Sequence, residues 1–153
     1  MKLEPVNLKK NLSECLEFRR DAHILSYGSD NSFNIEECTA WFNSLNNTSG
    51  FEHVILNEKI IGQIEFKSGI KDNKGVLTGY INLLYLLPDY RRKGYGLELQ
   101  KYIFSKLIAD GCVLAYLRYL PENTIAHAFY VKNGWSPLGV PNERGQLMVQ
   151  RLI

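Results

Sequence analysis

The chain changes the spacing of its apolar residues several times, and each change marks a boundary between a predicted helix and a predicted strand. Between residues 8 and 25 an irregular apolar stripe faces charged residues, which is typical of an amphipathic helix. Asn34 then stands where a helix N-cap is expected, and Glu37 follows it at the spacing of a capping box. This pattern predicts a second helix that ends near residue 45 and buries Trp41 and Phe42.

Three strands are predicted next, over residues 51–56, 59–66 and 76–87. Asn57 and Glu58 separate the first two, which indicates a tight hairpin, and the short links predict antiparallel pairing. In the second strand, period-two alternation predicts one face formed by Ile60, Gly62, Ile64 and Phe66, and another formed by Ile61, Gln63 and Glu65. Residues 1–6 are expected to form a short edge strand, because Pro5 cannot donate to a ladder.

A helix, a strand, a second helix and a hairpin complete the predicted order. The helix after Gly96 ends at Asp110-Gly111, and residues 112–119 form a strand that should lie parallel to its predecessor, because a helical crossover separates them. A helix from Asn123 to about Lys132 and a final hairpin follow. Adjacent parallel strands whose ends splay apart would leave a cleft. We therefore predict an α/β (α+β) fold with a mixed, mostly antiparallel sheet and about four helices, in one domain over residues 1–153.

Composition and charge exclude several classes of protein. The chain is 45% hydrophobic and 22% charged, and its net charge of +2 is too small to indicate a nucleic-acid partner. Cys15, Cys38 and Cys112 are widely spaced without a CxxC pair, which predicts reduced thiols of a cytoplasmic protein and no metal site. The N-terminus lacks the apolar core of a signal peptide, and no apolar run approaches membrane-spanning length. The sequence does not indicate an oligomeric state.

Residues 83–96, with the sequence LLYLLPDYRRKGYG, carry the clearest functional pattern. An apolar run turns at Pro88, a cluster of cations follows, and two closely spaced glycines precede an amphipathic segment. A strand, a glycine-bearing basic loop and a helix together form an anion site, because the free N–H groups and the macrodipole of the helix N-terminus favour negative charge. Glycine lets the backbone approach the ligand closely.

The same loop does not match the two common nucleotide-binding patterns. A dinucleotide-binding GxGxxG needs a third small residue, and Leu99 occupies that position. The phosphate loop of nucleoside triphosphatases needs Lys and Ser or Thr after the glycine, and here Leu97 and Glu98 follow Gly96. A basic turn that only caps a helix remains the structural alternative.

Two motifs resemble the GCN5-related N-acetyltransferase (GNAT) family. The first, Arg91-x-x-Gly94-x-Gly96, is similar to its acyl-CoA pyrophosphate loop, whose pattern is Arg/Gln-x-x-Gly-x-Gly/Ala. The second lies one predicted strand later and resembles the other family signature: Asn123-x-x-Ala126-x-x-Phe129-Tyr130-x-x-x-Gly134-Trp135. Both stand in the family's order, and the resemblance covers roughly residues 51–152. The resemblance implies a GNAT-like fold whose parallel strand pair splays at a cofactor cleft.

The resemblance also implies an activity and a set of site residues. The activity would be acetyl-CoA-dependent N-acetyl transfer to a primary amine, either on a small molecule or on a protein N-terminus or lysine. The backbone of Leu84, Tyr85 and Leu86 would pair with the pantetheine arm. The pyrophosphate would be bound by the loop that Arg91 begins: Arg92, Lys93, Gly94, Tyr95, Gly96 and Leu97. Asn123 would bond to the cofactor arm, and Tyr130 would protonate the departing thiolate.

Several assignments keep an alternative. Asn123 could serve only as an N-cap, and Tyr130 could be a packed aromatic residue. At the two positions where many family members carry a catalytic glutamate, this chain has Tyr80 and Arg118, so no family base transfers. Glu65 is a candidate base, with a solvated carboxylate as the simpler interpretation. Glu122 is possible too, and His23, His53 and His127 are read as structural or surface residues. Loss of a base also leaves a non-catalytic acyl-CoA sensor as a second hypothesis.

Overall fold

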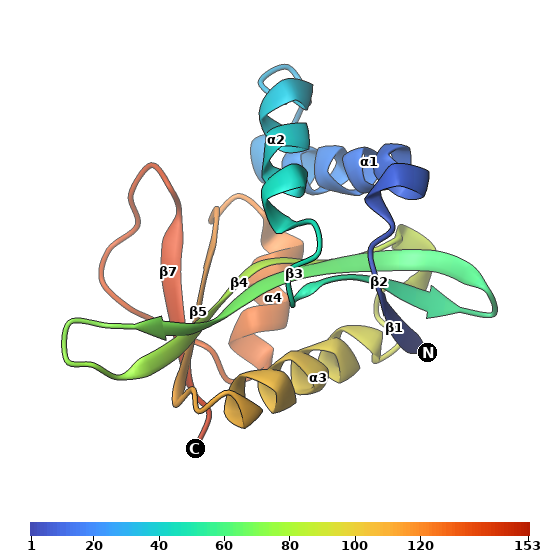
Figure 1. Cartoon of the computed structure of the whole chain (residues 1–153). Helices are drawn as coiled ribbons and strands as arrows, with labels where there is room; N and C mark the ends of the chain where they lie inside the picture. The colour runs from blue at the N-terminus through green and yellow to red at the C-terminus, as the bar shows by residue number, and fades with distance from the viewer.

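The computed structural model describes residues 1–153 and contains one seven-stranded sheet with helices on both faces (Figure 1). The elements run in this order: β1 (Lys2–Pro5), α1 (Leu8–Tyr27), α2 (Ile35–Leu45), β2 (Phe51–Leu56), β3 (Lys59–Lys71), β4 (Leu77–Leu86), a 3₁₀ turn (Pro88–Tyr90), α3 (Tyr95–Ala109), β5 (Leu114–Tyr119), α4 (Thr124–Lys132), β6 (Ser136–Pro137) and β7 (Gln146–Arg151). Figure 1 shows α1 and α2 on one face of the sheet and α3 and α4 on the other.

The sheet has the order β1-β2-β3-β4-β5-β7-β6. Only β4 and β5 pair in parallel, and the other neighbours are antiparallel. The sequence-based fold class is therefore confirmed, including the parallel strand reached through a helical crossover. The assignment of residues 1–153 to one domain stays a prediction.

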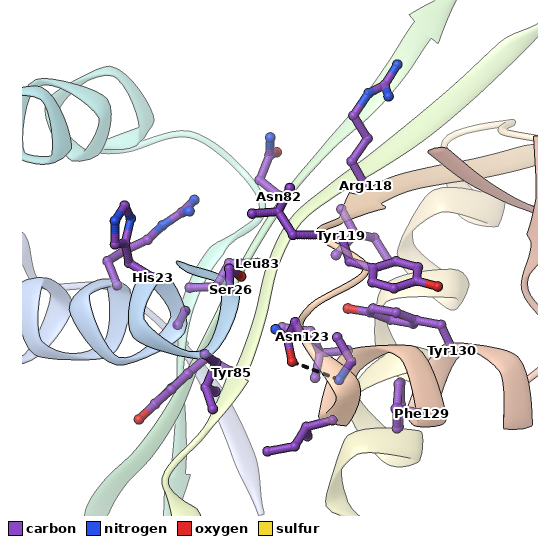
Figure 2. A pocket seen from close by; sticks show the side chains of 18 of the residues that line it. His23, Ser26, Asn82, Leu83, Tyr85, Arg118, Tyr119, Asn123, Phe129 and Tyr130 are labelled. Carbon is purple, nitrogen blue, oxygen red and sulfur yellow. Dashed lines mark hydrogen bonds between the residues drawn. The ribbon is translucent and has the colours of Figure 1, made fainter. Parts of the chain in front are cut away.

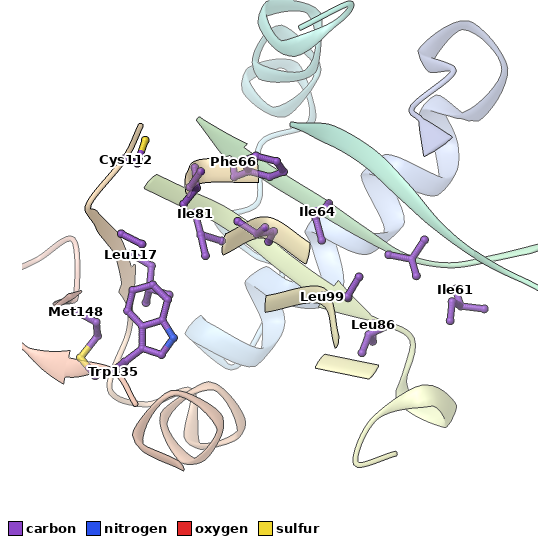
Figure 3. Close-up of a cluster of buried hydrophobic side chains, with 14 residues drawn as sticks. Ile61, Ile64, Phe66, Ile81, Leu86, Leu99, Cys112, Leu117, Trp135 and Met148 are labelled. Atoms are coloured by element: carbon purple, nitrogen blue, oxygen red, sulfur yellow. The ribbon is translucent and has the colours of Figure 1, made fainter. Parts of the chain in front are cut away.

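The main core lies between the sheet and α3 (Figure 3). Leu99, Ile103 and Leu107 of α3 are fully buried there at the spacing of one helical face. They pack against apolar side chains of the central strands and of the segment before β6 (Ile61, Ile64, Phe66, Ile81, Ala115, Leu117, Trp135 and Met148). A smaller cluster on the opposite face joins α1 and α2 to the sheet through Cys15, Phe42, Leu45 and Phe51. Phe42 is buried as predicted, whereas Trp41 is only partly buried.

The predicted faces of β3 are wrong at its start. The register between β2 and β3 shifts at Val54 and Ile55, because one extra residue of β3 lies opposite this step. As a result Ile61 packs in the α3-side core with Ile64, and Ile60 packs on the α1 side. Ile60 and Ile61 are adjacent isoleucines, so the sequence of β3 fits either phase of the alternation and could not reveal the bulge.

A second bulge marks the point where the sheet opens. Glu65 pairs with Leu83 and Phe66 pairs with Ile81, so Asn82 is the extra residue of β4. The parallel pairing of β4 with β5 ends at the same place, at Ile81 and Leu117. Beyond it β4 continues beside β3 to Leu86, while the end of β5 pairs with β7. The two parallel strands therefore diverge, as the sequence predicted.

Candidate functional site

A cleft of about 1290 Å³ opens where β4 and β5 diverge (Figure 2). Residues of α1, α2, β4, β5 and α4, together with the loops before α3 and β7, line it. The lining includes most of the residues that the two sequence motifs single out. They are Leu84, Tyr85, Leu86, Arg91, Arg92, Gly94, Gly96, Leu97, Asn123 and Tyr130. Lys93 and Tyr95 belong to the same loop but do not line the cleft.

The N-terminus of α3 differs from those of the other three helices. α1, α2 and α4 each begin at an asparagine whose side-chain oxygen accepts a backbone N–H: Asn7 from Lys10, Asn34 from Glu37 and Asn123 from Ala126. α3 begins at Gly94, whose φ of 90° is favourable only for glycine and which offers no side-chain cap. The first N–H groups of α3 are thus left for a ligand, and the macrodipole there favours an anion.

The loop leaves room for such a ligand next to its backbone. A Cβ placed on Gly94 would meet no atom within 4 Å, so the cleft reaches the chain itself at this point. A Cβ on Gly96 would lie 2.9 Å from Cε2 of Phe129, so this glycine allows α3 and α4 to approach each other. The two glycines of the motif therefore serve two purposes, one conformational and one steric.

Arg91 is held by the protein itself. Its Nη2 donates to Asp21 Oδ2 at 2.9 Å, its Nε donates to the Leu86 carbonyl at 2.8 Å, and its guanidinium lies over the Tyr85 ring. The Tyr85 hydroxyl donates to the same Asp21 carboxylate, and burial raises the pKa of Tyr85 above its usual value. The first residue of the motif therefore fixes the loop against α1. Arg92 and Lys93, in contrast, are exposed and form no ion pair in the structure.

The edge of β4 that faces the cleft has no strand partner beyond Ile81. Leu87 donates its N–H to the Ile61 carbonyl of β3 at 2.8 Å. Alternation along the strand then turns the backbone groups of Leu84 and Leu86 toward the opposite edge, which is the cleft. Because Arg91 already uses the Leu86 carbonyl, the Leu84 backbone is the freer of the two.

Asn123 and Tyr130 face each other across the start of α4 (Figure 2). Oδ1 of Asn123 accepts from the Ala126 N–H at 3.1 Å, and its amide nitrogen makes no hydrogen bond within the chain. The Tyr130 ring packs against Tyr119, Phe129 and Trp135, while its hydroxyl has no partner in the chain and points toward the cleft. Burial raises the pKa of Tyr130 to about 12. Each residue thus combines its structural role with a polar group that remains free.

Glu65 lies in the interior, away from the cleft lining. It is fully buried and forms an ion pair with Arg19. Trp41 Nε1 donates to its Oε1 at 2.6 Å, and Gln63 Nε2 donates to its Oε2 at 2.8 Å. The expectation of a solvated carboxylate is wrong, because α1 and α2 cover this part of the sheet. Because its oxygens are occupied by these donors and it does not line the cleft, we do not propose Glu65 as the base. Glu122 is exposed and does not line the cleft either.

Sequence reasoning missed three polar residues of the cleft or read them differently. Asn82, the extra residue of β4, has a buried Oδ1 without a hydrogen-bond partner. His23 was read as a structural or surface residue, yet it lines the cleft, where Nε2 lies 2.9 Å from Ser32 Oγ and its ring packs on Tyr27. Arg144 reaches the cleft from the loop before β7. None of the three stands in a motif, and only the folded chain brings them together.

Two further properties of the structure concern metal binding and membrane-spanning helices. No group of three or more His, Cys, Asp or Glu side chains is arranged to bind a metal ion. No helix has both the length and the apolar character needed to cross a membrane.

Comparison with known proteins agrees with this geometry. The family model described as acetyltransferase (GNAT) family matches residues 12–135. No curated protein sequence matches the chain significantly. Among solved structures, the PaiA N-acetyltransferase of Thermoplasma acidophilum, in complex with coenzyme A, has a TM-score of 0.70 at 19% identity, with 98% of each chain covered.

Two other solved structures have the same fold. A ribosomal-protein-alanine N-acetyltransferase of Brucella melitensis has a TM-score of 0.73 at 12% identity over 99% of each chain. Naa50 of Arabidopsis thaliana, in complex with the bisubstrate analogue CoA-Ac-MVNAL, has a TM-score of 0.69 at 20% identity over 97% of each chain. At these identities the structures show a shared fold, and the family model, which matches most of the chain, identifies the relationship. The chain belongs to the acetyltransferase (GNAT) family of acetyl-CoA-dependent acyltransferases.

Proposed function

We propose that this protein transfers an acetyl group from acetyl-CoA to a primary amine by direct attack of the amine on the thioester. The observation that carries the proposal is the unpaired edge of β4, which runs from the open N-terminus of α3 toward the free hydroxyl of Tyr130. An extended pantetheine arm fits such an edge, because it can use the backbone groups that a neighbouring strand would otherwise take.

The loop from Arg92 to Leu97 and the first turn of α3 would receive the pyrophosphate. Their contribution is mainly backbone N–H groups, with Arg92 and Lys93 adding positive charge. The free amide nitrogen of Asn123 would donate to the pantetheine arm, while Oδ1 continues to cap α4. The solved structures with coenzyme A or a CoA-based bisubstrate analogue support a cofactor of this class.

In the reaction, a neutral amine forms a C–N bond to the thioester carbonyl, and the C–S bond then breaks. The products are an amide and CoA, and the amine loses one proton. The Leu84 N–H is placed to stabilise the developing oxyanion. Tyr130, whose pKa is raised to about 12, would donate a hydrogen bond to the thiolate as charge develops there. The lining contains a single carboxylate, Glu37, which is exposed at the start of α2. We therefore assign the role of proton acceptor for the amine to water in the cleft.

The acceptor belongs to the class of primary amines, small or peptidic. Bound peptides or peptide-based analogues in related structures support a peptide as one possibility.

Tyr130→Phe tests the proposal directly. The substitution keeps the ring and its packing and deletes only the hydroxyl. We expect turnover to fall by about 100-fold, the usual effect of one positioned proton donor, with little change in acetyl-CoA affinity. Thiol release with an amine panel measures turnover, and calorimetry measures affinity. Tyr90→Phe, in the 3₁₀ turn and outside the cleft lining, is the matched control and should change neither value. Acetyl-CoA binding without thiol release from any amine would instead indicate a sensor.

A further inference from the structure

Two arginines without a carboxylate partner, Arg118 and Arg144, line the part of the cleft that lies beyond the open edge of β4. The neighbour of Arg118 in β5, Leu117, packs in the core against α3. Alternation therefore turns the Arg118 side chain to the other face of the sheet, the face of α1 and α2. Figure 2 shows Arg118 and Asn82 on one side of the diverging strands and Asn123 and Tyr130 on the other.

The turn before β7 brings Arg144 to the same place. Asn142 and Gly145 bridge each other, and Asn142 Oδ1 accepts the Arg144 N–H at 2.8 Å, so the turn is well defined. Gly145 packs directly on β5, where a Cβ would lie 2.4 Å from the Tyr119 carbonyl oxygen. Nη1 of Arg118 donates to the Gly145 carbonyl at 3.4 Å. The docked turn thus holds Arg144 next to the end of β5.

The guanidiniums of Arg118 and Arg144 both influence the pKa of Tyr80, which also lines the cleft. Burial raises the pKa of Tyr80 above its usual value, and the positive charges of Arg118 and Arg144 oppose this rise. Tyr80 lies opposite Tyr116 in the paired part of the two strands, one step before the divergence. The two charges therefore lie close to the point where β4 and β5 diverge.

The remaining charges of the cleft are balanced or lie elsewhere. Asp21 and Glu65 neutralise the other two arginines near α1, Arg91 and Arg19. Arg92 and Lys132 belong to the loop before α3 and to α4, on the cofactor side. Glu37 is the sole carboxylate of the lining, and Glu143 lies beside Arg144 in the chain without lining the cleft. The acceptor side therefore carries two uncompensated positive charges.

We propose that the acetyl acceptor is a small amine that carries an oxyanion, either a carboxylate or a phosphate, and that Arg118 and Arg144 bind this oxyanion. The proposal rests on the N-acetyltransferase function proposed above. A guanidinium presents donors in a planar fork that matches both kinds of oxyanion and stays charged at every relevant pH. Polycationic amines would meet repulsion on this side.

The test compares acceptors that differ only in the oxyanion. The native protein is assayed for thiol release with β-alanine and with phosphoethanolamine, and each is compared with its neutral counterpart, β-alaninamide or ethanolamine. Spermidine serves as the cationic acceptor. We expect kcat/KM to be about 10- to 100-fold higher for at least one anionic amine than for its counterpart, the effect of one or two charge-assisted hydrogen bonds. A larger ratio for the β-alanine pair would indicate a carboxylate, and a larger ratio for the phosphoethanolamine pair would indicate a phosphate.

Arg118→Gln and Arg144→Gln then assign the preference to these residues. In each variant the ratio should fall at least fivefold, because the KM for the anionic amine rises more than the KM for the neutral amine. Arg144→Lys should restore part of the ratio, which a merely structural role would not predict. Arg151→Gln, at the far end of β7 and outside the cleft, is the matched control. Because Arg144 is exposed in a turn, its variants test the proposal even if Arg118→Gln fails to fold.

Three results would overturn the inference while leaving the proposed function intact. They are equal rates with anionic and neutral amines, a preference for spermidine, and a preference that survives both arginine substitutions. Weaker acetyl-CoA binding in the variants with an unchanged acceptor preference would assign the two guanidiniums to the cofactor phosphates. If no amine is acetylated, calorimetry of β-alanine and phosphoethanolamine on the CoA-loaded protein decides. Binding that both variants lose supports the anion site, and no binding overturns it.

Discussion

The two halves of the cleft are built on different principles. In the half proposed to bind the cofactor, called the cofactor half, the unpaired edge of β4, the loop before α3 and the start of α4 offer mainly backbone groups. In the half proposed to bind the acceptor, called the acceptor half, side chains from α1, α2, β5 and the loop before β7 form the lining. Backbone groups are the same for every residue type, so ligand binding in the cofactor half depends on the path of the backbone. Ligand binding in the acceptor half depends on which charged side chains line it.

Because of this difference, we expect the two halves to be sensitive to different kinds of substitution. An added methyl group should damage the cofactor half more than the loss of a surface charge, because the loop must stay open and tightly turned. In the acceptor half the loss of a charge should matter more, because it contains the Arg19–Glu65 ion pair and the two unpaired guanidiniums of Arg118 and Arg144.

The largest effect is expected for Glu65→Gln, beneath the acceptor half. Removing the carboxylate leaves Arg19 without its buried partner and weakens the contact with Trp41. Loss of one member of a buried ion pair costs about 3–5 kcal/mol in the free energy of unfolding. Urea unfolding measures this cost, and acetyl-CoA affinity of the folded fraction should be nearly unchanged.

The control for Glu65→Gln is Glu4→Gln, which breaks the surface pair of Glu4 with Lys2. Surface pairs contribute little, so we expect a change below about 1 kcal/mol. Comparable effects of the two substitutions would contradict a structural role for the Glu65 network. A large loss of acetyl-CoA affinity in folded Glu65→Gln would contradict the independence of the two halves.

Gly96→Val should give the largest effect in the cofactor half. The new side chain would strike Phe129 and separate α3 from α4, and overpacking of this kind costs about 1–3 kcal/mol. Because this displaces the first turn of α3, we expect acetyl-CoA affinity, measured by calorimetry, to fall about 10- to 100-fold, or about 1.4–2.8 kcal/mol of binding free energy. Lys93→Gln in the same loop removes an exposed charge and should lower affinity by less than about fivefold. If folded Gly96→Val binds acetyl-CoA normally, the loop does not receive the pyrophosphate.

The same contrast explains what the sequence could and could not predict. The glycine loop and the Asn123–Tyr130 segment are local motifs, so the resemblance to the family motifs could predict their place beside the cleft. The strand order and the parallel pair followed from the lengths of the links. The bulges at Ile61 and Asn82 could not be predicted, because a bulge depends on the partner strand.

The acceptor half escaped prediction for a related reason. Its residues come from segments more than 100 positions apart, such as His23 and Arg144, and each segment taken alone shows no functional pattern. Glu65 was misjudged because its burial depends on α1 and α2, which pack over β3 from elsewhere in the chain. Arg91 was read as part of the cofactor loop, while its partner Asp21 lies 70 residues earlier.

The pH dependence of turnover tests how the two halves share proton transfer. If the acceptor amine itself must be neutral and water takes its proton, kcat/KM should rise about tenfold per pH unit up to the amine's own pKa. Burial raises the pKa of Tyr130 to about 12, so the donor stays protonated and no alkaline decline is expected below about pH 10.

Two acceptors whose amine pKa values differ by about 2 units provide the measurement, because the inflection should move with the acceptor. An inflection that stays at one pH for both acceptors would instead indicate a base of the protein, and His23 is the one imidazole in the lining. Its disappearance in His23→Gln would assign the base to that residue and contradict proton transfer to water.

The smallest effect separates the two roles of Asn123, which caps α4 through Oδ1 and offers its amide nitrogen to the cleft. Asn123→Asp keeps a capping oxygen and removes the donor, whereas Asn123→Ala removes both. Loss of an N-cap costs about 1 kcal/mol, so Asn123→Ala should destabilise the protein by this amount and Asn123→Asp should not. If the amide donates to the cofactor arm, both variants should bind acetyl-CoA about fivefold more weakly, the value of one hydrogen bond. Thermal unfolding and calorimetry give the two quantities separately. Normal affinity in Asn123→Asp would show that this residue is only a cap, and the cofactor half would then rely on backbone groups even more than proposed.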